Sequence, residues 1–280
     1  MRNRINTRES LRSRKNVRQR YTSHFGGSLQ AAKDVSQNSI RTVIGLHAAR
    51  EVLKVRPKAI TEIWLKVGAE RSRDHIAFIE FAKKNLLKLQ IKSGGQLDKI
   101  APSHQGVCVL VNETPDYDFE NLSNDPSEKI VLLALDEVTD PHNVGAVLRT
   151  AWLLGAKAIL VPENRSAHLT PAVMKVASGG AEHVPLVNIG SLATCLTALK
   201  KKGFWIYGLD GSASSHLPKI HFNPKVVLVV GAEDKGLRST TAAVCDELIS
   251  IPQNTNEASF NASVAAALAL YEVARQHQTP

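Results

Sequence analysis

The stretch DPHNVGAVLRTAW, residues 140–152, follows the apolar run IVLLAL (130–135) and the acidic step Asp136–Glu137. Six consecutive aliphatic residues have the length of a buried strand. Within the stretch, apolar residues recur at helical spacing and form one stripe. The members of this stripe are Val144, Val147, Leu148, Ala151 and Trp152. We therefore predict a strand over 130–136 and a helix over 143–154.

The start of this predicted helix carries three residues that call for an explanation. Asn143 stands where an N-cap belongs, and Pro141 stiffens the turn before it. Gly145 in the first turn costs about 1 kcal/mol relative to alanine, which predicts a close approach to the backbone there. Arg149 follows one turn later, off the apolar stripe. Taken alone, a capped helix with an exposed arginine explains the stretch as well.

Strands and helices alternate from residue 130 almost to the end of the chain. After the first pair we predict strands at 157–161, 204–208, 226–230 and 247–251, and helices at 169–178, 191–202, 236–245 and 260–276. Several of these strands are uniformly apolar, which is typical of strands that are buried on both faces. The pattern predicts an α/β fold with a mostly parallel sheet covered by helices on both sides.

A shorter version of the same pattern occupies residues 40–112. We predict a helix from near Gly45, a helix over 73–89, and strands at 60–67, 87–92 and 106–112. This pattern indicates a small α/β domain. Residues 113–128 are acidic and contain proline, so they are typical of a linker. The second domain then spans 129–280.

The positive charge of the chain is concentrated before residue 40. Residues 1–39 hold nine of the 35 Lys and Arg but only two of the 26 Asp and Glu, whereas the remainder is nearly neutral. We predict a basic flexible arm that attracts phosphate backbones without reading their sequence. Two alternatives stay open: a solvated tail without a partner, and an organellar transit peptide, which the few apolar residues of the arm disfavour.

Several classes of protein and of site find no support in the sequence. No apolar run approaches the ~20 residues of a membrane-spanning helix. Cys108, Cys195 and Cys245 are far apart, and the ten histidines show no ligand spacing, so we predict no metal site and a reducing, cytoplasmic location. Neither G-x-G-x-x-G nor G-x-x-x-x-G-K-[ST] occurs, so the common dinucleotide and triphosphate cradles are missing.

A second stretch of interest is VVLVVGAEDKGLRS, residues 226–239. A buried strand runs straight into Gly231, an acidic pair and Gly236. Ligands of α/β sheets collect beyond the carboxyl ends of the strands. Glu233 in this position either accepts a hydrogen bond from a ligand or favours a helix N-terminus.

A third stretch is LISIPQNTNEASFNASVAAALALYEVARQ, residues 248–276. After a strand and Pro252 comes a polar loop, and then Ser259, Asn261 and Ser263 open an alanine-rich helix. Serine and asparagine are normal caps, but three small polar groups exceed what one cap requires. The alanines would allow close packing on the body of the protein or on a second copy.

Together the three stretches resemble the motifs of the TrmH/SpoU branch of the SPOUT RNA methyltransferases: N-x-G-x-x-x-R, G-x-E-x-x-G, and I-P followed by S-L-N-x-S. The matching residues are Asn143, Gly145 and Arg149; Gly231, Glu233 and Gly236; and Ile251, Pro252, Ser259, Asn261 and Ser263. The resemblance covers about 41–276. Within the family, the chain is most similar to RlmB-type 23S rRNA guanosine-2′-O-methyltransferases, through segments such as DPHNVGAVLRTA and CDELISIP.

The resemblance implies a fold, a cofactor and partners. Residues 129–280 would form a SPOUT domain with a parallel sheet and a C-terminal segment threaded into a deep trefoil knot. S-adenosylmethionine would be held by Gly231, Ile251 and Phe260. Residues 40–112 would bind structured RNA, most plausibly rRNA, and the protein would be a homodimer packed through the knotted region and the last helix.

The resemblance also implies a reaction, the transfer of a methyl group from a sulfonium to a ribose 2′-OH. The hydroxyl must be placed in line with the methyl carbon and must lose its proton. In the family this work falls to the motif arginine, here Arg149. Because a guanidinium is a very weak base, we favour a role in holding the neighbouring phosphate and stabilising the alkoxide. Asn143, Glu233, Ser259 and Asn261 would orient the arginine and the ribose.

Three residues depart from the family pattern and leave alternatives open. Gln253 and Thr255 stand where relatives usually have Met and Gly, and Phe260 replaces Leu. These changes affect the expected cofactor site more than the reaction type. One alternative keeps the chemistry but moves it to tRNA, or to rRNA in antibiotic self-protection. Another is a catalytically idle RNA-binding or ribosome-assembly factor.

Overall fold

The computed structural model describes residues 40–100, 102–112, 119–164, 168–255 and 257–278. The predicted basic arm, 1–39, lies outside these residues, as does the part of the predicted linker at 113–118. From Arg41 onward the chain forms one compact unit. In the described part of the chain, no helix has both the length and the apolar character needed to cross a membrane.

The first sheet is small and mixed, with the strand order β1-β4-β2-β3. Its strands are β1 (Arg41–Ile44), β2 (Ile60–Lys66), β3 (Lys88–Lys92) and β4 (Val107–Val111). Its helices are α3 (Leu46–Val55), α4 (Arg73–Lys84) and α5 (Gly94–Asp98), with 3-10 turns at Pro57–Ala59 and Ala69–Arg71. The predicted elements are confirmed, and β1 and α5 are additional. Helix α4 is shorter than predicted, because Leu86 takes a positive φ of 53° soon after its end.

The second sheet has seven parallel strands in the order β7-β6-β5-β10-β8-β11-β9. The strands are β5 (Ile130–Asp136), β6 (Ala158–Pro162), β7 (Leu186–Ile189), β8 (Trp205–Leu209), β9 (Ser215–His216), β10 (Lys225–Gly231) and β11 (Glu247–Ser250). This arrangement confirms the predicted α/β fold. The sequence pattern missed β7 and the two-residue β9.

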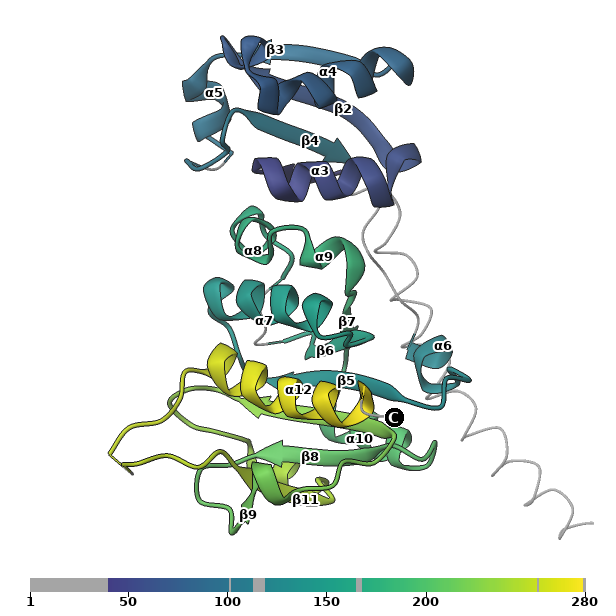
Figure 1. Cartoon of the computed structure of the whole chain (residues 1–280), viewed down its shortest axis with the longest axis vertical. Helices are drawn as coiled ribbons and strands as arrows, with labels where there is room; N and C mark the ends of the chain where they lie inside the picture. Colours follow the sequence, from purple (N-terminus) through teal and green to yellow (C-terminus); the bar gives the residue numbers. More distant parts are fainter. Residues whose placement is uncertain (1–39, 101, 113–118, 165–167, 256, 279–280) are drawn as a thin grey trace, which may run out of the picture. The chain divides into compact units, whose positions relative to one another are not determined.

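Helices cover both faces of this sheet (Figure 1). The helices of this part of the chain are α6 (Phe119–Ser123), α7 (Pro141–Leu153), α8 (Pro171–Ala177), α9 (Gly180–His183), α10 (Leu192–Lys200), α11 (Ser239–Ala242) and α12 (Ala262–Gln278), with a 3-10 turn at Leu217–Lys219. Helices α8 and α9 pack on α7 and not on the sheet itself. The helix predicted over 236–245 is therefore only four residues long. Helix α6 falls within the predicted linker, and its Leu122 is fully buried.

Alternate residues of the central strands enter different cores. Leu133 and Leu135 of β5 join the core on the side of α7 and α12, whereas Leu132 and Ala134 join the core on the side of α10. Every residue of β5 is buried. This double burial explains the uninterrupted apolar run in the sequence, since a strand with one solvated face would alternate.

Helix α7 begins earlier than predicted. Asp140, not Asn143, is its N-cap: the Asp140 carboxylate accepts a hydrogen bond of 2.9 Å from the backbone N–H of His142. Pro141 occupies the first helical position, where its fixed φ suits a helix and its missing N–H costs nothing. Asn143 is consequently inside the first turn and buried, so its side chain is available for a different contact.

The close approach predicted at Gly145 comes from helix α8 of the same chain. A Cβ atom on Gly145 would lie 2.6 Å from the Cβ of Val176 and 2.9 Å from the carbonyl oxygen of Val173. These distances are shorter than real contacts of a Cβ atom. Gly145 therefore allows α7 and α8 to pack backbone against side chain, which explains a glycine inside a helix.

We predict that Gly145→Ala destabilises the fold by about 1–3 kcal/mol, the usual cost of overpacking, despite the better helix propensity of alanine. The free energy of unfolding in urea measures this change. Gly190→Ala is the matched control, because Gly190 has an ordinary φ and no atom within 4 Å of its Cβ position. A Gly145→Ala variant as stable as wild type would mean that α8 moves aside without cost.

Candidate functional site

The three sequence motifs meet at the carboxyl edge of the large sheet. Strands β5 and β10 are parallel neighbours, and their register pairs Asp136 with Gly231. From β5 the chain proceeds to β6 and β7 on one side, whereas β10, β8 and β11 lie on the other. Such a change of direction opens a crevice at the strand ends, the usual place for a ligand in this class of fold. The first motif lies in helix α7, which follows β5, and the segments after β10 and β11 carry the second and third motifs.

One side-chain amide joins the three motifs. The Nδ2 of Asn261 donates to Oδ1 of Asn143 at 2.9 Å and to Oε2 of Glu233 at 3.0 Å. The Oδ1 of Asn261 accepts from the backbone N–H of Ser263 at 2.9 Å and from its hydroxyl at 2.6 Å. Since a backbone N–H can only donate, the contact with the backbone N–H of Ser263 fixes which end of the Asn261 amide carries the oxygen. Asn261 thus caps α12 and bridges the other two motifs at once.

Arg149 lies on the exposed side of α7, two turns beyond Asn143. Its side chain makes no hydrogen bond or ion pair with any residue that the structure describes. Its backbone is tightly packed all the same: a Cβ atom on Gly180 of α9 would lie 2.9 Å from the Arg149 Cα. The helix that carries the guanidinium is therefore fixed, while the charged group itself faces solvent.

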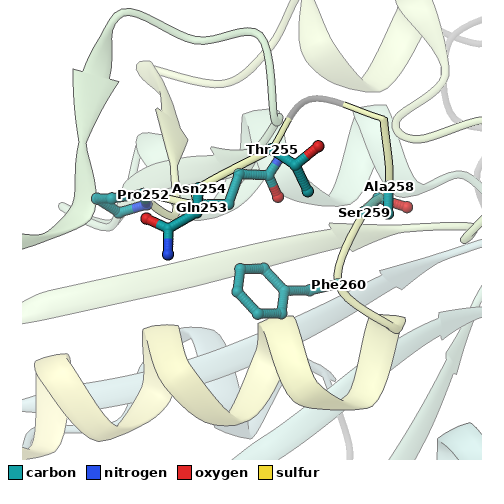
Figure 2. A pocket seen from close by; sticks show the side chains of 7 residues that line it. All are labelled: Pro252, Gln253, Asn254, Thr255, Ala258, Ser259 and Phe260. Carbon is teal, nitrogen blue, oxygen red and sulfur yellow. The ribbon is translucent and has the colours of Figure 1, made fainter.

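The loop between β11 and α12 encloses a hollow of about 360 Å³. Figure 2 shows the Phe260 ring pointing back beneath the segment Pro252–Thr255. The lining residues are Pro252, Gln253, Asn254, Thr255, Ala258, Ser259 and Phe260. Phe260 is 39% exposed, and its ring offers an apolar surface beside polar side chains.

The other two residues predicted to hold the cofactor do not line this hollow. Ile251 is half-buried and packs against the large core. Gly231 ends β10, and a Cβ atom there would lie 2.2 Å from the carbonyl carbon of Gly236. The loop closes on itself at this point through a bridge between Ala232 and Gly236, whose φ is 65°. Both glycines of the second motif are thus explained by the closure of the loop.

The residue changes in the third motif are accommodated without strain in the described loop. Neither Asn254 nor Thr255 has a positive φ. The Thr255 hydroxyl accepts a hydrogen bond of 3.2 Å from the backbone N–H of Glu257. A threonine in place of the family glycine therefore stabilises the turn with its own side chain.

The sequence pattern missed an ion pair that supports the second motif. Asp136, fully buried at the end of β5, accepts from the backbone N–H of Arg238 at 2.9 Å and from its Nε at 2.6 Å. The neighbouring Glu137 has a positive φ of 61° and lies 3.6 Å from the same guanidinium. The sequence offers only the positions of the two residues as a hint: Asp136 ends an apolar strand, and Arg238 stands two residues after the G-x-E-x-x-G motif.

The site contains no grouping suited to a metal. Among the residues that the structure describes, no three His, Cys, Asp or Glu side chains lie close enough to hold an ion. Burial raises the pKa of the Cys245 thiol to about 12, so its nucleophilic thiolate is scarce. What the site offers is one exposed guanidinium, an amide and carboxylate network, and a hollow lined by polar groups and an aromatic ring.

We predict that Asn261→Asp keeps the cap of α12 but breaks the bridge. A carboxylate still accepts a hydrogen bond from the backbone N–H of Ser263. It has no donor for the Asn143 oxygen, however, and its negative charge repels Glu233. The expected loss is about 1–3 kcal/mol, the cost of leaving a buried acceptor without its donor, measured by urea unfolding. Asn188→Asp, which adds the same charge on an exposed strand residue, is the control. Adding Glu233→Gln should recover part of the loss; no recovery would contradict the bridge.

Comparison with known proteins identifies both parts of the chain. The SpoU rRNA Methylase family matches residues 130–271, and the family described as RNA 2'-O ribose methyltransferase substrate binding matches 42–117. The 23S rRNA (guanosine-2'-O-)-methyltransferase RlmB of Pseudomonas putida is 36% identical over 245 residues, covering 86% of this chain and 98% of the relative. RlmB of Acinetobacter baylyi is 39% identical over 240 residues, covering 83% and 96%.

Solved structures share the fold at lower identity. The SpoU methyltransferase AviRb from Streptomyces viridochromogenes superposes with a TM-score of 0.73 at 21% identity, covering 85% of this chain and 90% of that one. A structure described as RNA 2'-O ribose methyltransferase gives 0.71 at 23% identity, covering 87% and 90%. With one family spanning half of the chain and relatives matching over almost their full length, this protein belongs to the SpoU rRNA methylase family.

Proposed function

We propose that this protein transfers a methyl group from S-adenosylmethionine to the ribose 2′-OH of a guanosine in 23S rRNA. The observation that carries the proposal is the bridge at Asn261, which brings Asn143 and Glu233 together beside the helix of Arg149. The names of the RlmB relatives, which match over 96–98% of their length, support the choice of RNA and nucleoside.

The hollow after β11 suits the cofactor. An adenosyl group has a flat aromatic face and a polar edge, and the hollow offers the half-exposed ring of Phe260 beside Gln253, Asn254 and Ser259. When bound, S-adenosylmethionine supplies an electrophilic methyl group on a sulfonium. Phe260 and the backbone near Ile251 and Gly231 would hold it. A related AviRb structure was solved in complex with AdoMet, at a TM-score of 0.72, which supports the same use of the fold.

Arg149 binds the phosphate next to the target ribose and stabilises the negative charge that develops on the 2′ oxygen. Two features favour this role. The side chain is exposed and, among the described residues, has no carboxylate partner that a phosphate must displace. A positive charge that is already in place costs little reorganisation as the alkoxide forms. In the family proposal Arg149 is the base. In the phosphate role Arg149 stays charged, and the proton of the 2′-hydroxyl passes to solvent water as the methyl group is transferred.

The bridge residues orient the reacting groups. Asn143 and Glu233 are held by Asn261, and the second Glu233 oxygen remains to accept a hydrogen bond from the ribose or from Arg149. Ser259 lines the hollow and supplies a hydroxyl at its rim. An intact bridge speaks against the idle RNA-binding factor, because a protein that only bound RNA would have no use for three joined motifs. Methylation of tRNA, or of rRNA in self-protection, needs the same site and is separated by the assay below.

The domain ranges and location follow from the same proposal. Residues 40–112 form the RNA-binding domain, 113–128 the linker, and 129–280 the SPOUT domain with its trefoil knot; the match to a substrate-binding family over 42–117 supports the first range. The basic residues before position 40 add attraction to the RNA backbone. An rRNA target fits a cytoplasmic enzyme that needs no metal.

The proposed homodimer is supported by the outer face of α12. Val264, Leu268 and Tyr271 are 45%, 38% and 59% exposed and recur at i, i+4 and i+7, so they form one apolar stripe on the surface. A row of large apolar side chains on one exposed helix face is typical of an interface. A second copy presenting the same stripe would cover it, as the two-fold symmetry of most dimers allows.

We predict that Arg149→Ala lowers the rate of methyl transfer to unmodified 23S rRNA by about 10²–10³-fold, the usual effect of removing a charge-stabilising donor. Transfer of labelled methyl groups at saturating RNA and cofactor measures the effect, with unmodified tRNA as a second substrate. Lys175→Ala, which removes an exposed cation from the neighbouring α8, should change the rate less than about twofold.

Calorimetry with S-adenosylmethionine completes this experiment. Wild type and Arg149→Ala should bind the cofactor equally. Full methyl transfer by Arg149→Ala would overturn the role of the arginine. If wild type does not bind the cofactor, the protein is better explained as a catalytically idle RNA-binding factor. If it methylates tRNA in preference to 23S rRNA, its substrate is tRNA.

We predict that Leu268→Glu converts the dimer to monomers, because it places a charge in the centre of the apolar stripe. Sedimentation velocity measures the change. Leu86→Glu is the control, since Leu86 is 93% exposed but lies in the small domain, and it should leave the dimer intact. A wild type that sediments as a monomer, or a Leu268→Glu variant that stays dimeric, would contradict the interface.

A further inference from the structure

Helix α9, Gly180–His183, lies between the small domain and the catalytic helix. It contacts α3 of the small domain on one side and α7, which carries Asn143 and Arg149, on the other. Two residues with positive φ separate it from α8: Ser178 at 49° and Gly179 at 97°. No residue of α9 belongs to the three sequence motifs or takes part in the proposed reaction.

The Glu182 side chain of α9 is fully buried and holds two arginines of the small domain. Arg41 of β1 donates to both carboxylate oxygens, at 2.7 and 2.6 Å. Arg56, just after α3, donates through Nε at 3.1 Å. The three side chains are 0%, 10% and 16% exposed. A two-pronged contact between a guanidinium and a carboxylate fixes orientation as well as distance.

The next residue of α9 makes a second link. Nε2 of His183 lies 3.0 Å from a carboxylate oxygen of Glu51 on α3. The ring of His183 stacks on Trp152 of α7, with centroids 4.2 Å apart and planes 6° from parallel. Trp152 is three residues beyond Arg149, so this chain of contacts runs from the small domain to the helix of the arginine.

The first residue of α9 touches the backbone of Arg149 itself. A Cβ atom on Gly180 would lie 2.7 Å from the carbonyl oxygen of Leu148 and 3.0 Å from the backbone nitrogen of Arg149. No atom can enter between α9 and α7 here. Helix α9 therefore cannot shift toward α7 at this point without displacing the backbone that carries Arg149.

We infer that Glu182 is a positioning residue, which sets the place of the RNA-binding domain relative to Arg149. Rigid contacts run from Arg41 and Arg56 through Glu182 and Gly180 to the backbone of the arginine. This inference rests on the proposed function, since it needs RNA held by the small domain to be methylated at the catalytic edge. A buried ion cluster is weak support for stability, but it specifies one arrangement of the parts that it joins.

The test measures catalysis, binding and domain placement in the full chain. Glu182→Gln keeps the size of the side chain but loses the charge that pairs with two arginines, and Arg41→Gln breaks the same contact from the other side. Both variants should lower kcat on 23S rRNA at least tenfold, because displacing the reacting groups by about 1 Å can cost about 10²-fold. Dissociation constants for RNA and for S-adenosylmethionine should change less than threefold.

Arg50→Gln is the matched control. Arg50 lies on α3 and pairs with Asp74 at 3.0 Å, but both residues belong to the small domain. This variant removes the same charge from the RNA-binding part without touching the link to α9, so kcat should stay within twofold of wild type. A similar loss of kcat in Arg50→Gln would mean that charge on the small domain, not placement, controls the rate, and would overturn the inference.

A distance measurement separates placement from stability. Spin labels on Leu86→Cys and Lys201→Cys, one exposed residue in each domain, should give one narrow distance in wild type and a broader one with Glu182→Gln. Burial raises the pKa of all three native thiols, those of Cys108, Cys195 and Cys245, to about 12, so they label slowly. An unchanged distance, or a lower melting temperature with unchanged kcat, would overturn the inference. If the wild-type protein methylates no RNA, the proposed function is wrong. The distance measurement then still tests whether Glu182 sets the position of the small domain.

Discussion

The site depends on one carboxamide that uses both of its ends. Asn261 caps α12 through its oxygen and joins Asn143 and Glu233 through its nitrogen. Asn261 and Asn143 are 118 positions apart in the sequence. The bridge between them and Glu233 therefore forms only when the sheet has assembled. No other common side chain offers an acceptor and two donors at this length and angle. The position therefore tolerates little chemical change, although it is not deeply buried.

The sheet brings the bridge together through its strand order. Because β5 and β10 are neighbours, the loop after each one begins beside the other, and Asp136 lies in register with Gly231. The buried Asp136 then holds Arg238 and so the far end of the second loop. Glycines make the remaining approaches possible: Gly231 lets its loop close, and Gly145 lets α8 lie against α7. The site is thus a consequence of packing as much as of its own polar residues.

Much of the fold and of the arrangement of the site could be predicted from the sequence. Where a prediction was wrong, the structure gives a physical reason. The apolar runs at β5 and β10 predicted strands buried on both faces, and the three motifs predicted which loops meet. The N-cap of α7 was wrong, because a proline at the first helical position moved the cap back to Asp140. The edge strand β7 was missed, and its four residues include the exposed Asn188, which interrupts the apolar run. Contacts between distant residues, such as Asp136 with Arg238 or Glu182 with Arg41, leave no periodic signal at all. The trefoil knot, the roles of the site residues and the dimer stay predictions.

The exposed guanidinium of Arg149 has a consequence for recognition. Many surface arginines sit against an internal carboxylate, and an incoming anion must compete with it. Within the described part of the chain, Arg149 has no such competitor, so the phosphate contact that we propose for it would displace only water and dissolved counterions. Under the proposed function, the contact would form without breaking any interaction inside the protein, and its affinity should fall as the ionic strength of the medium rises.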